Sequence, residues 1–240
     1  MSERDELLTD RPAEGVLRLR LNRPDRLNAI NAPLVGALIS ALDNVEARSV
    51  VLDSSSSQAF CSGVDLDIED VERAKVSDLL YELYEKIVKL PVPVVAAING
   101  HVVGAGVQLV VAADLRVAGP ETKMRVAGPG HGLAVAGWGL PSLIGRGRAL
   151  DLCLTMRAVG AEEALGIGLV DRIEREPSSA ALDLALAFAQ LDQEAVSRVK
   201  SLVTGSSGLL RALREERDGN RRAWSGSVAQ LISRRGEETR

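Results

Sequence analysis

Two glycine-rich turns hold the residues of this 240-residue sequence that could do chemistry. One runs from Gly100 to Gly106 (GHVVGAG) and the other from Phe60 to Leu66 (FCSGVDL). Each follows an apolar run typical of a buried strand, and the first opens into an apolar helix. Small residues at such a turn let a ligand approach backbone N–H groups that have no partner in the helix. Two turns of this kind could form an oxyanion hole around a carbonyl oxygen that gains negative charge.

Glycine-rich turns also bind dinucleotides and phosphates, but the spacing in this sequence fits neither of these motifs. A dinucleotide-binding fingerprint needs G-x-G-x-x-G, whereas the spacing here is G-x-x-x-G-x-G, with Gln108 and Leu109 where the third glycine would fall. A phosphate-binding P-loop needs Gly-Lys-Ser/Thr, which the sequence lacks. Tight packing at the end of a strand remains the alternative for either turn.

Cys61 precedes one of these turns and could act as a nucleophile only with a base such as His101 within hydrogen-bond reach. We expect it instead to be a small buried residue. Cys61 and Cys153 are far apart and have no C-x-x-C spacing, which is typical of a reduced intracellular protein. The charged N-terminus has no apolar signal region, so we expect a cytoplasmic location.

The turns must be positioned by an α/β core of short strands that alternate with helices. The apolar patterns predict strands at residues 16–21, 49–53, 92–98, 115–118 and 169–173. They predict helices at residues 32–46, 107–113, 149–156 and 161–168, and beyond Pro177 at 180–190, 194–203 and 209–222. We therefore divide the chain into an α/β core at residues 1–177 and a helical C-terminal region at 178–240.

The charge and the aromatic content of the sequence indicate which kinds of partner the protein does not bind. The 29 basic and 33 acidic residues give a net charge of -4, and aromatic residues make up only 2%, so we expect no nucleic-acid binding. No charged residue lies between Lys89 and Asp114, a length that could span a bilayer. Because prolines, glycines, His101 and Gln108 interrupt this run, a buried strand, a turn and a buried helix explain it better than a membrane span.

Four blocks resemble, in order and spacing, the crotonase superfamily, that is, the enoyl-CoA hydratase/isomerase family. They are LNRPDRLNAIN from Leu21, AFCSGVDL from Ala59, PVPVVAAINGHVVGAGVQLVVAADLRVA from Pro91 and AVGAEEALGIGLVDRI from Ala158. The resemblance implies a crotonase-like spiral of ββα units and a helical C-terminal region used in trimerisation, giving homotrimers or dimers of trimers. It also implies an acyl-CoA substrate whose thioester carbonyl sits in an oxyanion hole, with no metal and no cofactor besides this substrate.

The family's site residues fall on particular positions of this sequence. The two oxyanion donors fall on the backbone N–H groups of Val64 and Ala105. The CoA moiety would be held by the loop from Asp25 to Ala29 and by the turn that contains Ser62, Asp65 and Leu66. Arg26 is the residue that we place near a CoA phosphate, with a solvated surface cation as the alternative.

The sequence departs from the family where hydration would need acids and bases. Gln108 and Gly128 stand where hydratases of this family have their two glutamates, and an amide cannot accept a proton at neutral pH. His131 is the remaining acid/base candidate, with a loop or packing role as its alternative. Asp65 could cap the helix that follows it, and we expect Asp114 to be structural.

The resemblance and the departures predict an acyl-CoA-processing enzyme, a lyase or isomerase, that stabilises a thioester enolate and does not perform ordinary hydration. Isomerisation, decarboxylation and thioester hydrolysis all need fewer acid/base groups. The alternative is a catalytically silent acyl-CoA-binding paralog. Apolar residues in the C-terminal helices favour oligomerisation or packing on the core, and Arg221, Arg222, Arg234 and Arg235 make that end basic.

Overall fold

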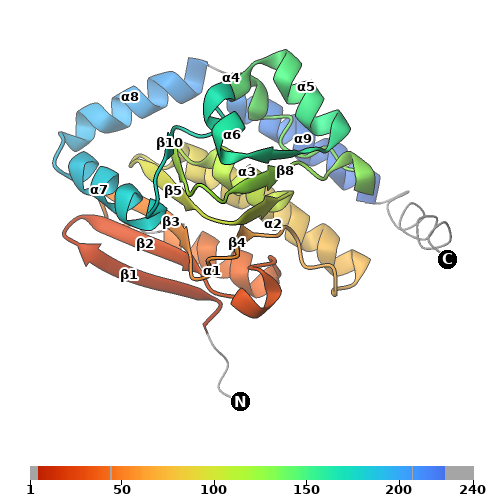
Figure 1. Ribbon diagram of the computed structural model, residues 1–240, viewed down its shortest axis with the longest axis horizontal. Coiled ribbons are helices and arrows are strands. Elements are labelled where there is room, and N and C mark those ends of the chain that lie inside the picture. Colours follow the sequence, from red (N-terminus) through yellow and green to blue (C-terminus); the bar gives the residue numbers. More distant parts are fainter. Residues whose placement is uncertain (1–4, 44, 207, 225–240) are drawn as a thin grey trace.

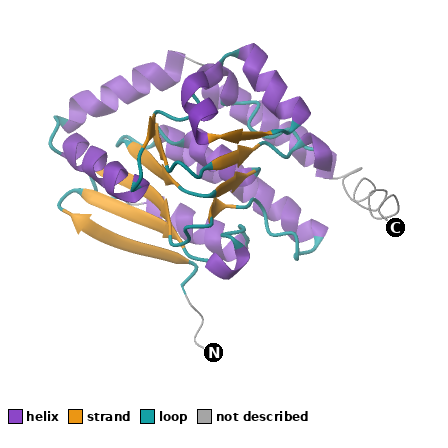
Figure 2. Ribbon diagram, in the orientation of Figure 1, coloured by secondary structure: helices purple, strands orange, loops and turns teal. Residues whose placement is uncertain are grey.

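The computed structural model describes residues 5–43, 45–206 and 208–224, and within them the chain forms two sheets (Figures 1 and 2). The larger sheet has the strand order β1-β2-β3-β5-β7-β10 and the smaller sheet the order β4-β6-β8-β9. The strands of the larger sheet are β1 (Leu7–Ala13), β2 (Val16–Leu21), β3 (Ser49–Ser54), β5 (Val94–Ile98), β7 (Leu115–Ala118) and β10 (Arg172–Ile173). Those of the smaller sheet are β4 (Ala59–Cys61), β6 (His101–Val103), β8 (Lys123–Arg125) and β9 (Ala158–Gly160).

Helices connect and cover these sheets. The α-helices of the described residues are α1 (Ala32–Asp43), α2 (Asp70–Lys89), α3 (Ala105–Ala112), α4 (Leu140–Ile144), α5 (Arg146–Thr155), α6 (Ala161–Ile167), α7 (Pro177–Ala189), α8 (Gln193–Ser206) and α9 (Leu209–Trp224). Two 3₁₀ turns, η1 (Pro24–Arg26) and η2 (Pro129–His131), lie in loops.

The chain repeats one unit, in which a strand of the larger sheet is followed by a strand of the smaller sheet and then by a helix. β3, β4 and α2 form one unit, β5, β6 and α3 form the next, and β7 and β8 lead into α4 and α5. This arrangement confirms the predicted α/β fold of ββα units.

The central strand β5 shows why the larger sheet forms here. All five of its residues are buried, and it pairs in parallel with β3 and β7. A parallel strand covered on both faces needs such a continuous apolar run. On one side α7 packs Ala181 and Ala185 against Val51 and Val95, and small alanines allow the helix to lie close to the sheet.

Several predicted elements are confirmed and one is wrong. The strands at residues 16–21, 49–53 and 115–118 are present, and the uncharged run from residue 90 to 113 forms β5, a turn, β6 and α3. The predicted strand at 169–173 shrinks to Arg172–Ile173, because Leu169 and Val170 donate their N–H groups to the carbonyl of Ala164 at the end of α6. Over the described residues, none of the helices has the length and apolar content needed to cross a bilayer.

The long helix α2 was not predicted, and it packs against the C-terminal helix α9. Arg217 and Arg221 of α9 both bind the carboxylate of Asp78 on α2 at 2.6–2.9 Å, and Arg214 pairs with Glu85. The predicted basic residues Arg234 and Arg235 lie outside the described residues.

Candidate active site

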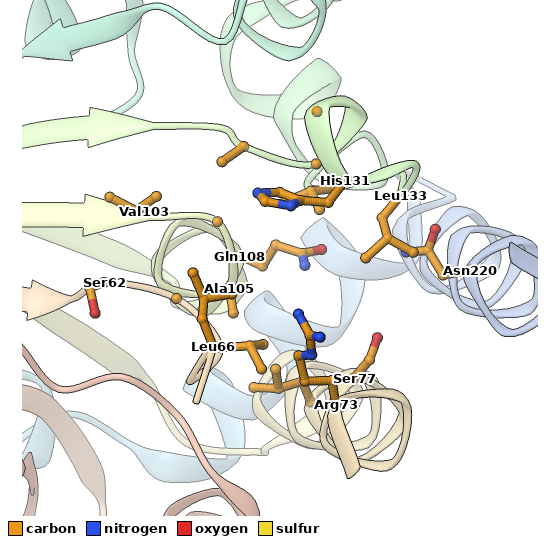
Figure 3. A pocket seen from close by; sticks show the side chains of 18 of the residues that line it. Ser62, Leu66, Arg73, Ser77, Val103, Ala105, Gln108, His131, Leu133 and Asn220 are labelled. Carbon is orange, nitrogen blue, oxygen red and sulfur yellow. The ribbon is translucent and has the colours of Figure 1, made fainter. Parts of the chain in front are cut away.

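A cavity of about 340 Å³ opens between the two glycine-rich turns (Figure 3). The turns at residues 62–66 and 103–108 form one wall. The other walls come from the cavity-facing side of α2, from the segment between residues 125 and 135, and from α9. The site therefore gathers residues that are up to about 160 positions apart in the sequence.

The two turns touch each other, and glycines make this approach possible. A Cβ atom at Gly106 would lie 2.6 Å from the carbonyl oxygen of Cys61, and one at Gly63 would lie 3.3 Å from the carbonyl oxygen of Val103. Gly63 and Gly104 also adopt positive φ angles of 105° and 54°, a conformation that costs glycine little. Each of these two glycines directly precedes a predicted oxyanion donor.

Those donors are the backbone N–H groups of Val64 and Ala105, and both residues line the cavity. Ala105 is the first residue of α3, so its N–H has no acceptor within the helix. Val64 lies opposite Ile30 in a β-bridge, but the hydrogen bonds of this bridge use its neighbours. The N–H of Ile30 donates to the carbonyl of Gly63, and the N–H of Asp65 donates to the carbonyl of Ile30. Neither N–H donates to another residue in the described part of the chain. The arrangement can place two free donors on one carbonyl oxygen.

Gln108 lies one helical turn after Ala105 and faces the same cavity. Its side-chain oxygen accepts hydrogen bonds from the indole Nε1 of Trp138 at 2.9 Å and from the backbone N–H of Ala136 at 3.1 Å. Both partners can only donate, so the oxygen must face them. The amide NH₂ group of Gln108 is therefore the part that is left for the cavity.

Gly128, which stands in place of a family glutamate, and His131, the remaining acid/base candidate, also line the cavity. A Cβ atom at Gly128 would lie only 2.5 Å from a methyl group of Val135, so this backbone has no room for a side chain at position 128. His131 ends the η2 turn, and Figure 3 shows its ring above Gln108. Both positions at which hydratases of the family have a glutamate therefore line the cavity, one as the amide Gln108 and the other as Gly128.

Carboxylates are missing from the residues that line this cavity in the described part of the chain, whereas Arg73, Arg125 and His131 are present. Glu216 lies nearby but turns its oxygens elsewhere, to the hydroxyl of Tyr81 at 2.7 Å and the N–H of Trp138 at 3.0 Å. Burial raises the pKa of the Glu216 carboxyl, which these hydrogen bonds partly oppose. Its position makes it a support for the cavity wall.

The predicted substrate-binding residues divide into two groups. Ser62 and Leu66 line the cavity, but Arg26, Ala29 and Asp65 do not. Arg26 is exposed and forms an ion pair with Asp67. The remaining two are joined by Arg23, whose Nη1 donates to the carbonyl of Ala29 at 2.5 Å and to Asp65 at 3.0 Å. These residues shape the loops beside the cavity.

The structure also shows what Asp65, Cys61 and Asp114 do. Asp65 does not cap the next helix, because its carboxylate accepts the N–H of Asp67 and α2 begins only at Asp70. Cys61 is buried as expected, and burial raises the pKa of its thiol to about 12, which opposes a nucleophilic role. Asp114 is structural, since it accepts the N–H of Val94 and pairs with Lys200 at 2.7 Å.

Sequence reasoning missed the contribution of α2 and α9 to the cavity. Arg73, Ser77 and Tyr81 recur every four residues on one face of α2, while Asn220 and Trp224 do so on α9. The signal for α2 was available in the apolar spacing of Val76, Leu80, Leu83 and Ile87, which are all buried.

The chain is similar in sequence to known proteins. A family model described as Enoyl-CoA hydratase/isomerase matches residues 11–230. "Probable enoyl-CoA hydratase echA6" of Mycobacterium bovis is 39% identical over 167 residues, which cover 67% of this chain and 68% of that protein. "Enoyl-CoA hydratase domain-containing protein 2, mitochondrial" of Mus musculus is 32% identical over 192 residues, which cover 75% of this chain and 65% of that protein.

Solved structures give the same result for the fold. The crystal structure of an enoyl-CoA hydratase from Bacillus anthracis superposes with a TM-score of 0.79 at 27% identity and covers 93% of this chain and 91% of that one. That of an enoyl-CoA hydratase/isomerase from Mycobacterium paratuberculosis superposes with a TM-score of 0.84 at 24% identity and covers 98% of this chain and 100% of that one.

Proposed function

The chain belongs to the enoyl-CoA hydratase/isomerase family, and from this premise we propose that it binds a CoA thioester with the carbonyl oxygen between the N–H groups of Val64 and Ala105. The observation that carries the proposal is that neither N–H group has a partner among the described residues and that both residues line one cavity. The CoA thioester is the substrate, and the proposed chemistry uses no further cofactor.

The proposed mechanism rests on charge that develops during the reaction. When the α-carbon loses a proton, or when an α-carboxylate leaves as carbon dioxide, the electron pair of the broken bond moves onto the thioester oxygen to form an enolate. Two preorganised N–H donors stabilise this oxyanion more than they stabilise the neutral carbonyl, and that difference lowers the barrier. The contact between the two turns at Gly106 and Cys61 holds the donors at a fixed separation.

We place the CoA moiety along the loop at residues 25–29 and the turn at 62–66. Ser62 and Leu66 lie at the cavity itself, while Ala29 and Asp65 keep the loop in place through Arg23. The ion pair of Arg26 with Asp67 is exposed, with 56% and 69% of the two side chains accessible. Since exposed ion pairs are weak, Arg26 can exchange Asp67 for a CoA phosphate at little cost.

We further propose that the reaction is not the usual hydration. Syn-hydration by two carboxylates needs a base for water and an acid for the α-carbon, and Gln108 and Gly128 supply neither. Isomerisation, decarboxylation and thioester hydrolysis need fewer protein groups. His131 is the cavity residue that we assign to any proton transfer, because imidazole ordinarily titrates near neutral pH.

A crotonyl-CoA hydration assay tests this assignment. We expect the wild-type protein to show no hydration above the uncatalysed rate, while isomerisation or decarboxylation of other thioesters is lost in His131→Ala. Robust hydration that survives in both Gln108→Ala and His131→Ala would show that the chemistry is misplaced.

A second candidate function is thioester binding without turnover. The observation that favours it is the lack of carboxylates among the described residues that line the cavity. It predicts binding of CoA thioesters by calorimetry and no product from enoyl-, β-keto- or malonyl-type esters, and product from any of them would reject it. For both candidates we propose a homotrimer or a dimer of trimers, which sedimentation would distinguish from a monomer.

A further inference from the structure

The cavity contains buried hydrogen-bond donors that have no acceptor. Among the described residues, the Nε of Arg73 and the indole Nε1 of Trp224 are both buried without a hydrogen-bond partner, and both residues line the cavity. Buried polar groups are nearly always paired, so an unpaired donor in a cavity indicates a missing acceptor. Arg73 keeps one ion pair, between its Nη2 and Asp70, and that pair leaves its Nε unused.

Gln108 adds a third donor that faces the cavity. Because Trp138 and Ala136 occupy its oxygen, its NH₂ group is fixed toward the cavity, and no hydrogen bond of that group joins it to another described residue. A glutamine that was free to flip could offer either an acceptor or a donor. Here the two donor-only neighbours make position 108 a donor.

The contacts between α2 and α9 place Trp224 at the same end of the cavity as Arg73. The two helices run in opposite directions, since Arg214 pairs with Glu85 and Arg221 pairs with Asp78. One further turn along α9 brings Trp224 beside the first turns of α2, where Arg73 lies.

Two of the polar side chains at this end, Asn220 and Tyr81, are already engaged, while Ser77, one helical turn from Arg73 on α2, also lines the cavity. Asn220 uses its oxygen for the N–H of Ala134, and the hydroxyl of Tyr81 donates to Glu216 and accepts from Asn220. In Figure 3 Arg73 extends from α2 toward Gln108, and Ser62 lies on the opposite side of Ala105. A thioester whose CoA leaves past Ser62 therefore directs its acyl group toward Arg73.

We propose that this end of the cavity binds a carboxylate on the acyl group, so that the protein selects CoA thioesters of short dicarboxylic acids. The inference rests on the proposed function, because it assumes that the thioester carbonyl lies at Val64 and Ala105. The guanidinium of Arg73 supplies charge-assisted hydrogen bonds, and the donors on Gln108 and Trp224 complete the set. An alkyl end would offer no acceptor to any of these three donors.

Calorimetry on the wild-type protein tests the proposal with matched pairs of thioesters. Malonyl-, succinyl- and glutaryl-CoA are compared with propionyl-, butyryl- and pentanoyl-CoA, which have the same chain lengths but end in a methyl group. We expect at least one dicarboxylic ester to bind about 10- to 100-fold more tightly than its partner. Equal or tighter binding of the methyl-ended ester at every length would overturn the proposal while leaving the proposed function intact. Binding of no thioester at all would instead overturn the proposed function.

Substitution of Arg73 identifies the group responsible. We expect Arg73→Gln to reduce the affinity ratio within the pair to about one, and Arg73→Lys, which keeps the charge without the planar fork, to retain part of it. Arg211→Gln, an exposed arginine on α9 outside the cavity, is the control and should leave the ratio unchanged. If Arg73→Gln weakens both esters of a pair equally, Arg73 serves the CoA moiety and the proposal is wrong.

Discussion

Trp138 donates its indole N–H to the side-chain oxygen of Gln108 at 2.9 Å, and this contact determines what the cavity can do at that position. The indole stacks on Tyr84, whose hydroxyl in turn donates to the carbonyl of Ala105. The amide, the indole and the oxyanion turn therefore form one connected support.

Gln108→Ala should destabilise the fold more than Gln108→Glu. Alanine removes the acceptor from two buried donors, on Trp138 and Ala136, and each unpaired donor costs about 1–3 kcal/mol. Glutamate keeps an acceptor for both. Urea unfolding at pH 7 measures the difference, and equal stabilities for the two variants would mean that these hydrogen bonds contribute little.

Gly106→Ala should separate the two turns. The new Cβ would lie 2.6 Å from the carbonyl oxygen of Cys61, so the backbone must shift, at a cost of about 1–3 kcal/mol. We expect the affinity for a CoA thioester to fall at least about tenfold, because the N–H groups of Val64 and Ala105 would no longer point at the same carbonyl oxygen.

Gly36→Ala is the matched control for that variant. Gly36 lies in helix α1, and a Cβ atom there would meet no atom within 4 Å. Alanine should stabilise the helix by about 0.5–1 kcal/mol and leave thioester binding unchanged. Similar losses of binding in Gly106→Ala and Gly36→Ala would refute the role assigned to the contact between the turns.

Asp78→Asn should lower stability in a manner that depends on pH. Hydrogen bonds from Arg217 and Arg221 hold the pKa of the Asp78 carboxyl well below its usual range. A lowered pKa in the folded state contributes stability above the unfolded pKa of about 3.9, and that contribution is lost as pH falls through the folded pKa. Solvent screening keeps the effect near about 0.5–1 kcal/mol.

Denaturation curves at pH 7 and near pH 3 check this behaviour. The stability difference between Asp78→Asn and the wild type should be present at pH 7 and should shrink at pH 3. Asp183→Asn, at an exposed position on α7, serves as the control and should show little difference at either pH. A difference for Asp78→Asn that grows toward low pH would have the wrong sign.

Cys61 should not react in the folded protein. Burial raises the pKa of its thiol to about 12 and that of Cys153 to about 11, so few thiolates form at pH 8. Mass spectrometry after iodoacetamide treatment should show full alkylation only in denaturant. Rapid native alkylation of Cys61, with loss of any turnover, would restore the nucleophile hypothesis.

Sequence patterns predicted those parts of the site that depend on local structure. Gly104 and Gly63 mark their turns because positive φ is a local requirement, so the two turns could be placed without knowledge of the packing. The choice of Val64 and Ala105 as donors came from the resemblance to the family, and the helix predicted from residue 107 begins two residues earlier, at Ala105.

The cavity wall opposite these turns could not be predicted in that way. Arg73 and Trp224 reach the site only because α2 packs against α9, through contacts between residues about 140 positions apart such as Asp78 and Arg217. The length of the strand at Arg172–Ile173 was overestimated for a different, local reason. The N–H groups of Leu169 and Val170 complete the C-terminus of α6 after Gly168, so they do not pair in a sheet.

A crystal structure of the protein with a bound acyl-CoA would test the central claim most directly. We predict that the thioester carbonyl oxygen lies about 2.7–3.1 Å from the backbone nitrogens of both Val64 and Ala105, with the acyl group beside Gln108. A thioester oxygen that lies away from both N–H groups would contradict the account.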